Sequence, residues 1–337
     1  MNKLTKYGVS ALCGSLAAVA SANAGELAVT GGADVTWTSL SGTQTGNPLG
    51  IGSNYGLSGS GELDNGWSVG LSIAMTNANA YSNTSVTVGI PSIGDVKLNQ
   101  GGSGTGIQRL DDITPTVWEE ADGAGLSLGA TKISGTSAGA TIEVTPTAFM
   151  PAGLTAVFAY SPDADGSSST SDKGVGGDSG PKGAGWDLTL QANSELLGVE
   201  GLEIYAGMSE VDNYQNSSTI SGDNSETVVG IKYAMGSFTA GWQQTEDDTG
   251  NASTNTNYEN TSYGITFSVN DDLSIGYGHV ESDRSSTTGV SSEADSFQVA
   301  YTMGGASFRI AEIQADNIGY VETDDRDATI ISMGLAF

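Results

Sequence analysis

The last ten residues of the chain, Ala328–Phe337, read ATIISMGLAF. Apolar side chains occupy every second position at Ile331, Met333, Leu335 and Phe337, which is the period of a β-strand with one apolar face. Chain ends usually fray, and a frayed end gains nothing from such a pattern. The alternation therefore predicts a terminal strand whose apolar face contacts something other than water.

The same period of two continues through most of the sequence. In residues 67–75 (WSVGLSIAM) large apolar residues alternate with Ser, Gly and Ala, and residues 297–303 (FQVAYTM) follow a similar rule. No window after residue 24 fits the helical period better over two turns. With 49 Gly among 337 residues and a hydrophobic fraction of 37%, the composition suits strands that are apolar on one face only. We therefore expect an all-β chain.

The connections between these segments fall into two alternating classes. One class is short and rich in turn residues, as in 63–66 (LDNG) and 235–237 (MGS), and the other is mostly long and polar, as in 162–183 and 282–293. A soluble sandwich has no reason to sort its connections in this way, whereas a transmembrane barrel has short periplasmic turns and long extracellular loops. An open sheet edge in lipid would leave unpaired backbone groups, so the terminal strand must pair with the first.

The number of strands depends on two weak segments. Residues 114–121 (TPTVWEEA) are interrupted by Glu119 and Glu120, and residues 140–149 (ATIEVTPTAF) contain Pro146. Because both chain ends lie on the short-turn side, the count must be even, so both segments are strands or neither is. The sequence predicts a transmembrane antiparallel up-and-down β-barrel of 18 strands, with 16 as the alternative.

The first 24 residues have the features of a secretory signal peptide. Lys3 and Lys6 precede a short apolar stretch, residues 8–20 (GVSALCGSLAAVA), and Ala22-Asn23-Ala24 supplies a cleavage site. The expected organisation is a signal peptide at 1–24 and a barrel domain at 25–337. The single cysteine, Cys13, lies in the leader, so the mature chain would have no disulfide, no cysteine-bound metal and no cysteine nucleophile.

The charge of the chain is strongly negative. Eleven Lys and Arg oppose 39 Asp and Glu, giving a formal net charge of -28, so nucleic-acid binding is excluded because it needs a basic surface. The acidic loops could attract Ca²⁺, but neither an EF-hand spacing nor a repeated calcium-binding nonapeptide is present. We expect no cofactor and no specific metal site, and only nonspecific Ca²⁺ at the acidic loops.

Four features together resemble the Gram-negative general porins, especially those of alphaproteobacteria. They are the leader ending in Ala22-Asn23-Ala24, the turn and strand 63–75 (LDNGWSVGLSIAM), the segment 93–106 (IGDVKLNQGGSGTG) and the terminal 330–337 (IISMGLAF). The resemblance implies the outer membrane of a Gram-negative bacterium, contact with its lipid and lipopolysaccharide, insertion by the barrel-assembly machinery and a homotrimer.

The last strand also resembles the assembly signal of outer-membrane barrels, a terminal Phe preceded by alternating apolar residues. Ile331, Met333, Leu335 and Phe337 match positions of that signal, although Leu335 stands where the family often has Tyr.

The resemblance further implies that a third loop, about residues 101–123, folds inward and forms a constriction. Charges of fixed sign at the narrowest point of a channel select solutes. The loop offers the following charged residues: Arg109, Asp111, Asp112, Glu119, Glu120 and Asp122. Alternation points Lys97, Lys232 and Arg309 into the lumen, since a charge on the lipid face would cost about 2 to 4 kcal/mol. Because this basic wall is sparse, we expect a weak preference for cations.

Three functions compete. The leading hypothesis is a porin for passive diffusion of ions and small hydrophilic solutes, and the alternative is a secreted acidic β-rich adhesin or surface-layer protein. A barrel enzyme would need a Ser–His pair on the lumen face, but His279 follows Leu273, Ile275 and Tyr277 on the outward face. We therefore expect no enzymatic activity.

Overall fold

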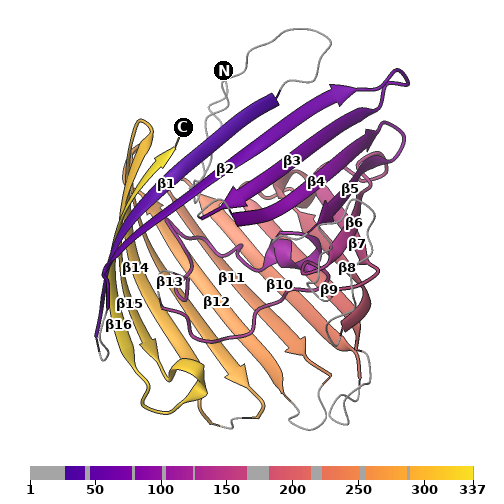
Figure 1. The fold of residues 1–337 in the computed structure, drawn as a ribbon. Coiled ribbons are helices and arrows are strands. Elements are labelled where there is room, and N and C mark those ends of the chain that lie inside the picture. Colours follow the sequence, from indigo (N-terminus) through magenta and orange to yellow (C-terminus); the bar gives the residue numbers. More distant parts are fainter. Residues whose placement is uncertain are drawn as a thin grey trace.

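The computed structural model describes residues 27–41, 46–77, 80–100, 104–123, 126–164, 182–213, 222–250, 256–286 and 289–336. Sixteen antiparallel strands in these ranges form one closed barrel, in which neighbours in sequence are neighbours in the sheet (Figure 1). The strands are β1 (Leu27–Leu40), β2 (Leu49–Glu62), β3 (Ser68–Thr76), β4 (Ala80–Ile90), β5 (Gly94–Gln100), β6 (Ala140–Thr145), β7 (Leu154–Ser161), β8 (Lys182–Ala192), β9 (Leu202–Asn213), β10 (Asn224–Met235), β11 (Phe238–Asp248), β12 (Asn257–Ser268), β13 (Leu273–Arg284), β14 (Ser292–Met303), β15 (Ala306–Asp316) and β16 (Arg326–Ala336). Helical turns in the described chain are η1 (Gly106–Leu110), α1 (Ser194–Leu197) and η2 (Ile318–Tyr320). None of these helices is long and apolar enough to cross a membrane.

The alternating sequence pattern becomes an inner and an outer face of the sheet. On β10, Val229 and Ile231 are exposed on the outside, whereas Glu226 and Val228 are buried on the inside. Successive strand residues point to opposite faces, so a period of two places all apolar residues of one parity on the outer surface. The predicted one-sided strands are confirmed.

The barrel closes between its first and last strands. In the β1–β16 ladder, Trp37 lies opposite Ile331 and Val35 lies opposite Met333. This pairing confirms the predicted role of the terminal strand as the seam that removes the last sheet edge. Ile331 is 46% exposed on the outer face. Phe337, like the signal peptide predicted at residues 1–24, falls outside the described residues.

The count of sixteen strands is the alternative of the two predicted values, and the preferred count of eighteen is wrong. Residues 114–121 lie in the segment between β5 and β6 and form no strand, whereas residues 140–145 form β6. Pro115 and Val117 lie against the inner wall, so an extended segment shows a period of two without pairing as a strand. The expectation that both weak segments or neither would be strands is also wrong, because residues 140–145 pair as β6 while the described residues between Gln100 and Ala140 contain no strand.

The short connections match the turn chemistry of the sequence. Gly66 and Gly236 adopt φ of 80° and 62°, which non-glycine residues rarely tolerate. The connection from β8 to β9 contains α1, which Asn193 caps by accepting a hydrogen bond from Glu195 N at 2.9 Å.

Part of the barrel interior is filled by a packed cluster of apolar side chains. It joins residues of the β5–β6 segment to the inner faces of β13–β16, and its larger members are Trp118, Leu126, Leu128, Val280, Ile313 and Ile330. The cluster fixes the β5–β6 segment to one side of the barrel.

Candidate functional site

The segment between β5 and β6 folds into the barrel, where Figure 1 shows it crossing the interior with η1 near the wall. We call its described residues, 104–123 and 126–139, the constriction loop. Ile107 and Leu110 of η1 are fully buried and pack with Tyr205 and Val228 of the wall. The sequence placed the end of this loop near residue 123, whereas the segment continues through Gly139 before β6 begins.

Three glycines on neighbouring wall strands leave room for the middle of the constriction loop. A Cβ on Gly241 would lie 2.5 Å from Cδ of Pro115, and one on Gly264 would overlap the carbonyl oxygen of Pro115. A Cβ on Gly276 would lie 3.2 Å from a methyl group of Val117. Pro115 can therefore lie this close to β11 and β12 only because Gly241 and Gly264 have no side chain, and Gly276 gives Val117 room against β13.

Amide side chains of the wall hold the loop backbone above these glycines. Gln243 Nε2 donates to Asp111 O at 3.0 Å, and Asn260 Nδ2 donates to Thr131 O at 2.9 Å. Gln298 accepts from the backbone N–H of Trp118 at 3.1 Å. Each bond satisfies a backbone group that the barrel interior would otherwise leave without a partner.

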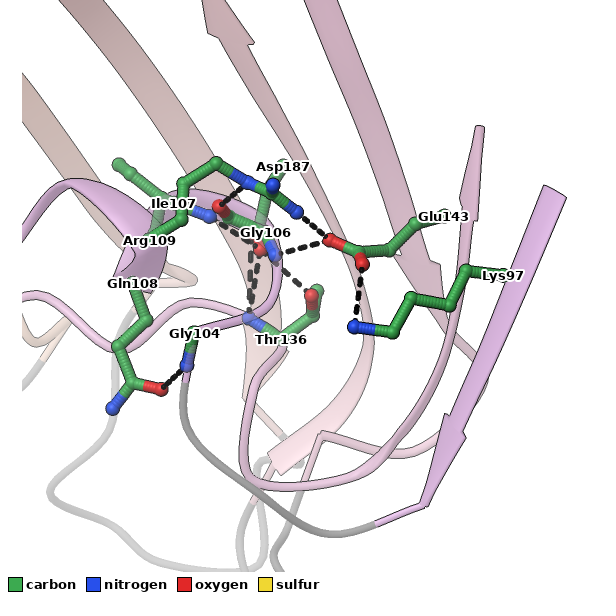
Figure 2. Close-up of polar contacts among 9 residues, drawn as sticks. All are labelled: Lys97, Gly104, Gly106, Ile107, Gln108, Arg109, Thr136, Glu143 and Asp187. Carbon is green, nitrogen blue, oxygen red and sulfur yellow. Dashed lines mark hydrogen bonds and ion pairs between the residues drawn. The ribbon is translucent and has the colours of Figure 1, made fainter. Parts of the chain in front are cut away.

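Wall carboxylates hold the two ends of the loop. Figure 2 shows Glu143 of β6 accepting a hydrogen bond from Gly106 N at 2.8 Å while its carboxylate also pairs with Arg109 and, at 3.8 Å, with Lys97. Asp187 of β8 accepts from the backbone N–H of Ile107 and Thr136. Glu226 of β10 accepts from Ser134 N and Gly135 N, both at 2.8 Å.

Lys132 gathers three of the acids that the sequence assigned to the constriction. Its Nζ pairs with Glu120, with Asp122 at 3.1 Å and with Asp112 at 3.7 Å. Burial lowers the pKa of Lys132, but Glu120 and Asp122 outweigh that effect and hold this pKa above its usual value. Lys132 therefore stays charged, and one cation serves three carboxylates.

Asp111 lies beside this group but forms no ion pair with Lys132. Burial, together with the charge of Asp112, raises the pKa of Asp111 to about 7. This carboxyl group consequently titrates near neutral pH, well above an ordinary aspartate.

Arg309 of β15 reaches across β16 to Asp34 of β1. Its Nη2 lies 3.0 Å from Asp34 Oδ2, and Ser332 Oγ donates to the other carboxylate oxygen at 2.5 Å. The guanidinium also faces the ring of Trp118 at 5.1 Å. A Cβ on Gly334 would overlap this guanidinium, so the glycine leaves space for the Arg309 side chain to cross β16.

The opposite wall of the lumen, β1–β4, carries no Lys or Arg. Its inward positions are mostly Gly, Ser and Thr, as at Thr30, Gly56 and Ser72. A cavity of about 440 Å³ lies between the constriction loop and the inner faces of β1, β14 and β15, and Asp34, Asp112, Glu119, Lys132 and Arg309 are among its lining residues. Asp112 and Glu119 are exposed in the cavity, whereas Lys132 is half-buried and Arg309 is buried, so the exposed charges of the lining are negative.

The last long connection also folds inward and braces the constriction loop. Gly319 N donates to Leu128 O at 2.8 Å. Tyr320 is buried although its φ is 64°, with its hydroxyl 2.7 Å from Ser282 Oγ and its ring 4.3 Å from the guanidinium of Arg284. A tyrosine rarely adopts a positive φ, and these contacts hold it there.

The structure places most of the predicted constriction residues in three separate charged groups. Lys97 and Arg109 meet on Glu143, Lys132 joins Asp112, Glu120 and Asp122, and Arg309 joins Asp34. Lys232 stands apart, since it pairs with Glu203 at 3.1 Å near the short turn that follows Met235.

His279 lies on the same outward face of β13 as Tyr277. Its Nδ1 is 2.8 Å from Asp295 Oδ1, and its ring stacks on Tyr263. Within the ranges that the structure describes, no three His, Cys, Asp or Glu side chains are placed to hold a metal ion.

Sequence reasoning missed the partners of the predicted charges: Asp34, Lys132, Glu143, Asp187 and Glu226. A usable signal existed for three of them, because Asp34, Glu143 and Asp187 each stand between two apolar residues. The flanking rule that placed basic residues in the lumen, applied to acids, would have placed these three there as well.

Known proteins share both sequence features and fold with this chain. The sequence model of Gram-negative porins matches residues 8–334. No curated protein matches the sequence.

Three solved structures illustrate the shared fold. OmpT, an outer membrane protein of Vibrio cholerae folded in vitro, is 14% identical, with a TM-score of 0.67 over 94% of this chain and 99% of its own. A substituted porin of Rh. blastica is 13% identical, with a TM-score of 0.60 over 93% and 100%. A porin refined at 1.8 Å resolution is 11% identical, with a TM-score of 0.64 over 93% and 100%.

Proposed function

This chain belongs to the Gram-negative porin family and is a β-barrel of the outer membrane, and from that premise we propose that it is a channel for passive diffusion of ions and small hydrophilic solutes with a weak preference for cations. The observation that carries the preference is the charge of the lumen. Asp112 and Glu119 face the cavity, whereas Arg309 is paired with Asp34 and Lys132 is shared by three acids. No catalysis is part of this function.

Removing either exposed carboxylate is expected to weaken the cation preference. A unit charge about 5 Å from an ion in water is worth somewhat under 1 kcal/mol, so Glu119→Gln or Asp112→Asn should lower the potassium-to-chloride permeability ratio roughly two- to fourfold. Reversal potentials in planar bilayers under a potassium chloride gradient measure this ratio. Glu210→Gln is the matched control, because Glu210 is an exposed acid on the outward face of β9.

Two results would reject the proposal. Folded protein that inserts without any current would favour the adhesin or surface-layer alternative. A permeability ratio that is equal in wild type, Glu119→Gln and Asp112→Asn would leave a channel but place its selectivity elsewhere.

The cation preference is expected to fall as the solution is acidified from pH 8 to pH 6. The pKa of Asp111 is raised to about 7, so this group is ionised above that pH and takes up a proton below it, which removes a negative charge from the lumen. Reversal potentials recorded across this range should show a step with a midpoint near pH 7. The variant Asp111→Asn should lack the step, and its persistence in that variant would show that another group causes it.

The proposed orientation places the long loops outside the cell and the short turns in the periplasm. Residues 1–24 direct export, and residues 25–337 form the barrel, whose outer face contacts lipid and lipopolysaccharide. The barrel-assembly machinery reads the terminal pattern of Ile331, Met333, Leu335 and Phe337. Any Ca²⁺ at the acidic loops is bound nonspecifically, and no cofactor takes part.

The proposed assembly is a homotrimer, and the distribution of outward charges supports it. Outward acids near the long-loop ends occur on the later strands, as at Glu210, Glu246 and Glu281. Outward positions of β1–β4 carry no charge, as at Val35, Leu57 and Ile73. That uncharged sector suits contact between subunits. In the same recordings a trimer would close in three equal current steps, and single-step closure of every inserted channel would argue against it.

A further inference from the structure

We propose that Asp187 is a positioning residue of the channel. Its carboxylate accepts hydrogen bonds from two segments of the constriction loop, which we call its limbs, and by holding them in place it sets the cross-section of the channel. The first limb is residues 104–110, and the second is residues 133–139. The inference rests on the proposed function for its consequence, the size of the passage, but its geometry is independent of that function.

One carboxylate accepts hydrogen bonds from both limbs. Ile107 N of the first limb donates to Asp187 Oδ2 at 3.0 Å. From the second limb, Thr136 Oγ1 donates to the same oxygen at 2.7 Å, and Thr136 N donates to it at 3.2 Å. Figure 2 shows the contacts of Ile107 and Thr136 meeting on this side chain, and Asp187 is fully buried.

Glycines in both limbs allow this close approach. A Cβ on Gly106 would overlap Asp187 Oδ2, and one on Gly135 would lie 2.6 Å from Oδ1. Both glycines also have positive φ, 54° and 52°, a region that other residues rarely adopt. The sequence of each limb is thus fitted to a carboxylate at this position on the wall.

The neighbouring wall acids act differently from Asp187. Among the described contacts, Glu143 bonds the first limb only, at Gly106 and Arg109, and Glu226 bonds the second limb only, at Ser134 and Gly135. Asp187 lies on β8, between β6 and β10 in the barrel, and it accepts hydrogen bonds from both limbs. Loss of Asp187 would therefore remove the hydrogen bonds that the two limbs share and leave only the packing of Ile107 and Leu110 against Ile133 to join them, whereas loss of either neighbour would remove bonds from one limb.

The charge of Asp187 is compensated by the loop itself. Nearby Arg109 pairs with Glu143, and among the described residues no Lys or Arg forms an ion pair with Asp187. Its partners are the N–H groups of Ile107 and Thr136 and the Thr136 hydroxyl, a cradle of the kind that binds anions. Without the aspartate, these donors would surround a space that fits a small free carboxylate.

The first test is amide hydrogen exchange of the folded protein in detergent, which does not depend on conduction. Asp187→Ala removes charge-assisted hydrogen bonds, so exchange in residues 104–110 and 133–139 should speed up roughly tenfold or more. The matched control is Asp247→Asn, because Asp247 is also a buried wall acid but bonds Asn224 of the neighbouring strand. An unheated gel confirms that each variant is folded.

The second test is rescue. Adding sodium formate to Asp187→Ala should restore slow exchange in both limbs, whereas sodium chloride at the same concentration should not. In bilayers the same variant should admit larger neutral polymers and show noisier open-channel current, and formate should reverse both changes. If the wild type conducts no ions, the proposed function fails while the exchange test still decides the role of Asp187.

Wild-type exchange in folded Asp187→Ala would overturn the inference. Faster exchange in only one limb would also overturn it, because the limbs would then be independent. Faster exchange in both limbs without any response to formate would show that Asp187 supports packing and does not act as the shared acceptor.

Discussion

Ile331→Arg is expected to prevent most of the protein from folding into the barrel. Ile331 lies at the middle of β16, points outward and pairs with Trp37 across the seam. An arginine on the lipid face at mid-bilayer costs about 2 to 4 kcal/mol, and here that penalty acts on the strand that closes the sheet. The fraction of protein with folded mobility on unheated gels, after insertion into liposomes over a urea series, measures the effect.

A lumen-facing arginine provides the control for this prediction. Thr302 of β14 lines the cavity and is exposed there, so Thr302→Arg adds the same side chain on the wet face. It should fold nearly as well as the wild type and change only conduction. Equal loss of folding in both variants would mean that the cost arises from the arginine itself and not from lipid exposure.

Asp34→Asn and Arg309→Gln are expected to move ion selectivity in opposite directions. Asp34→Asn leaves the guanidinium of Arg309 without its carboxylate, so the preference for cations should fall. Arg309→Gln leaves Asp34 unpaired, so the preference should rise. Each shift in the permeability ratio should be roughly two- to fourfold, since an unpaired unit charge acts through a narrow aqueous space. Reversal potentials under a salt gradient report both.

The double variant shows whether the pair is electrically silent. Arg309 Nη2 and Asp34 Oδ2 are 3.0 Å apart, so their fields largely cancel for an ion in the cavity. Removing both charges should therefore leave conductance and selectivity close to those of the wild type. If the double variant conducts poorly or changes its selectivity, the two charges act on the solute separately.

The sequence contained enough information for the barrel but not for the way its interior is filled. The alternation of apolar residues predicted the outer face, as at Val229 and Ile231, and the closing strand, as at Ile331 and Met333. It did so because contact with lipid imposes the same alternation on every strand. Val117 obeys the same period for another reason, since it lies against a wall glycine, Gly276. Local periodicity does not distinguish these two environments, and eighteen strands were predicted instead of sixteen.

The charged site was predictable in composition but not in pairing. The loop acids Asp112, Glu120 and Asp122 were identified from their place in the sequence, yet their common partner, Lys132, lies further along the same loop. The partner of Arg309 is Asp34, at the other end of the chain. Such pairs depend on barrel closure and on how the loop turns inside it, neither of which leaves a local pattern.

The contacts of the constriction loop determine when the passage can acquire its final shape. The loop is encoded between β5 and β6, but Trp118 is held by Gln298 of β14, and Leu128 is held by Gly319 after β15. Contacts between residues so distant in sequence form late, because the chain between them must be ordered first. A sheet assembled only through its early strands would contain the constriction loop but lack both of these contacts. The loop can therefore reach its final position only after β14 and the connection between β15 and β16 have been added.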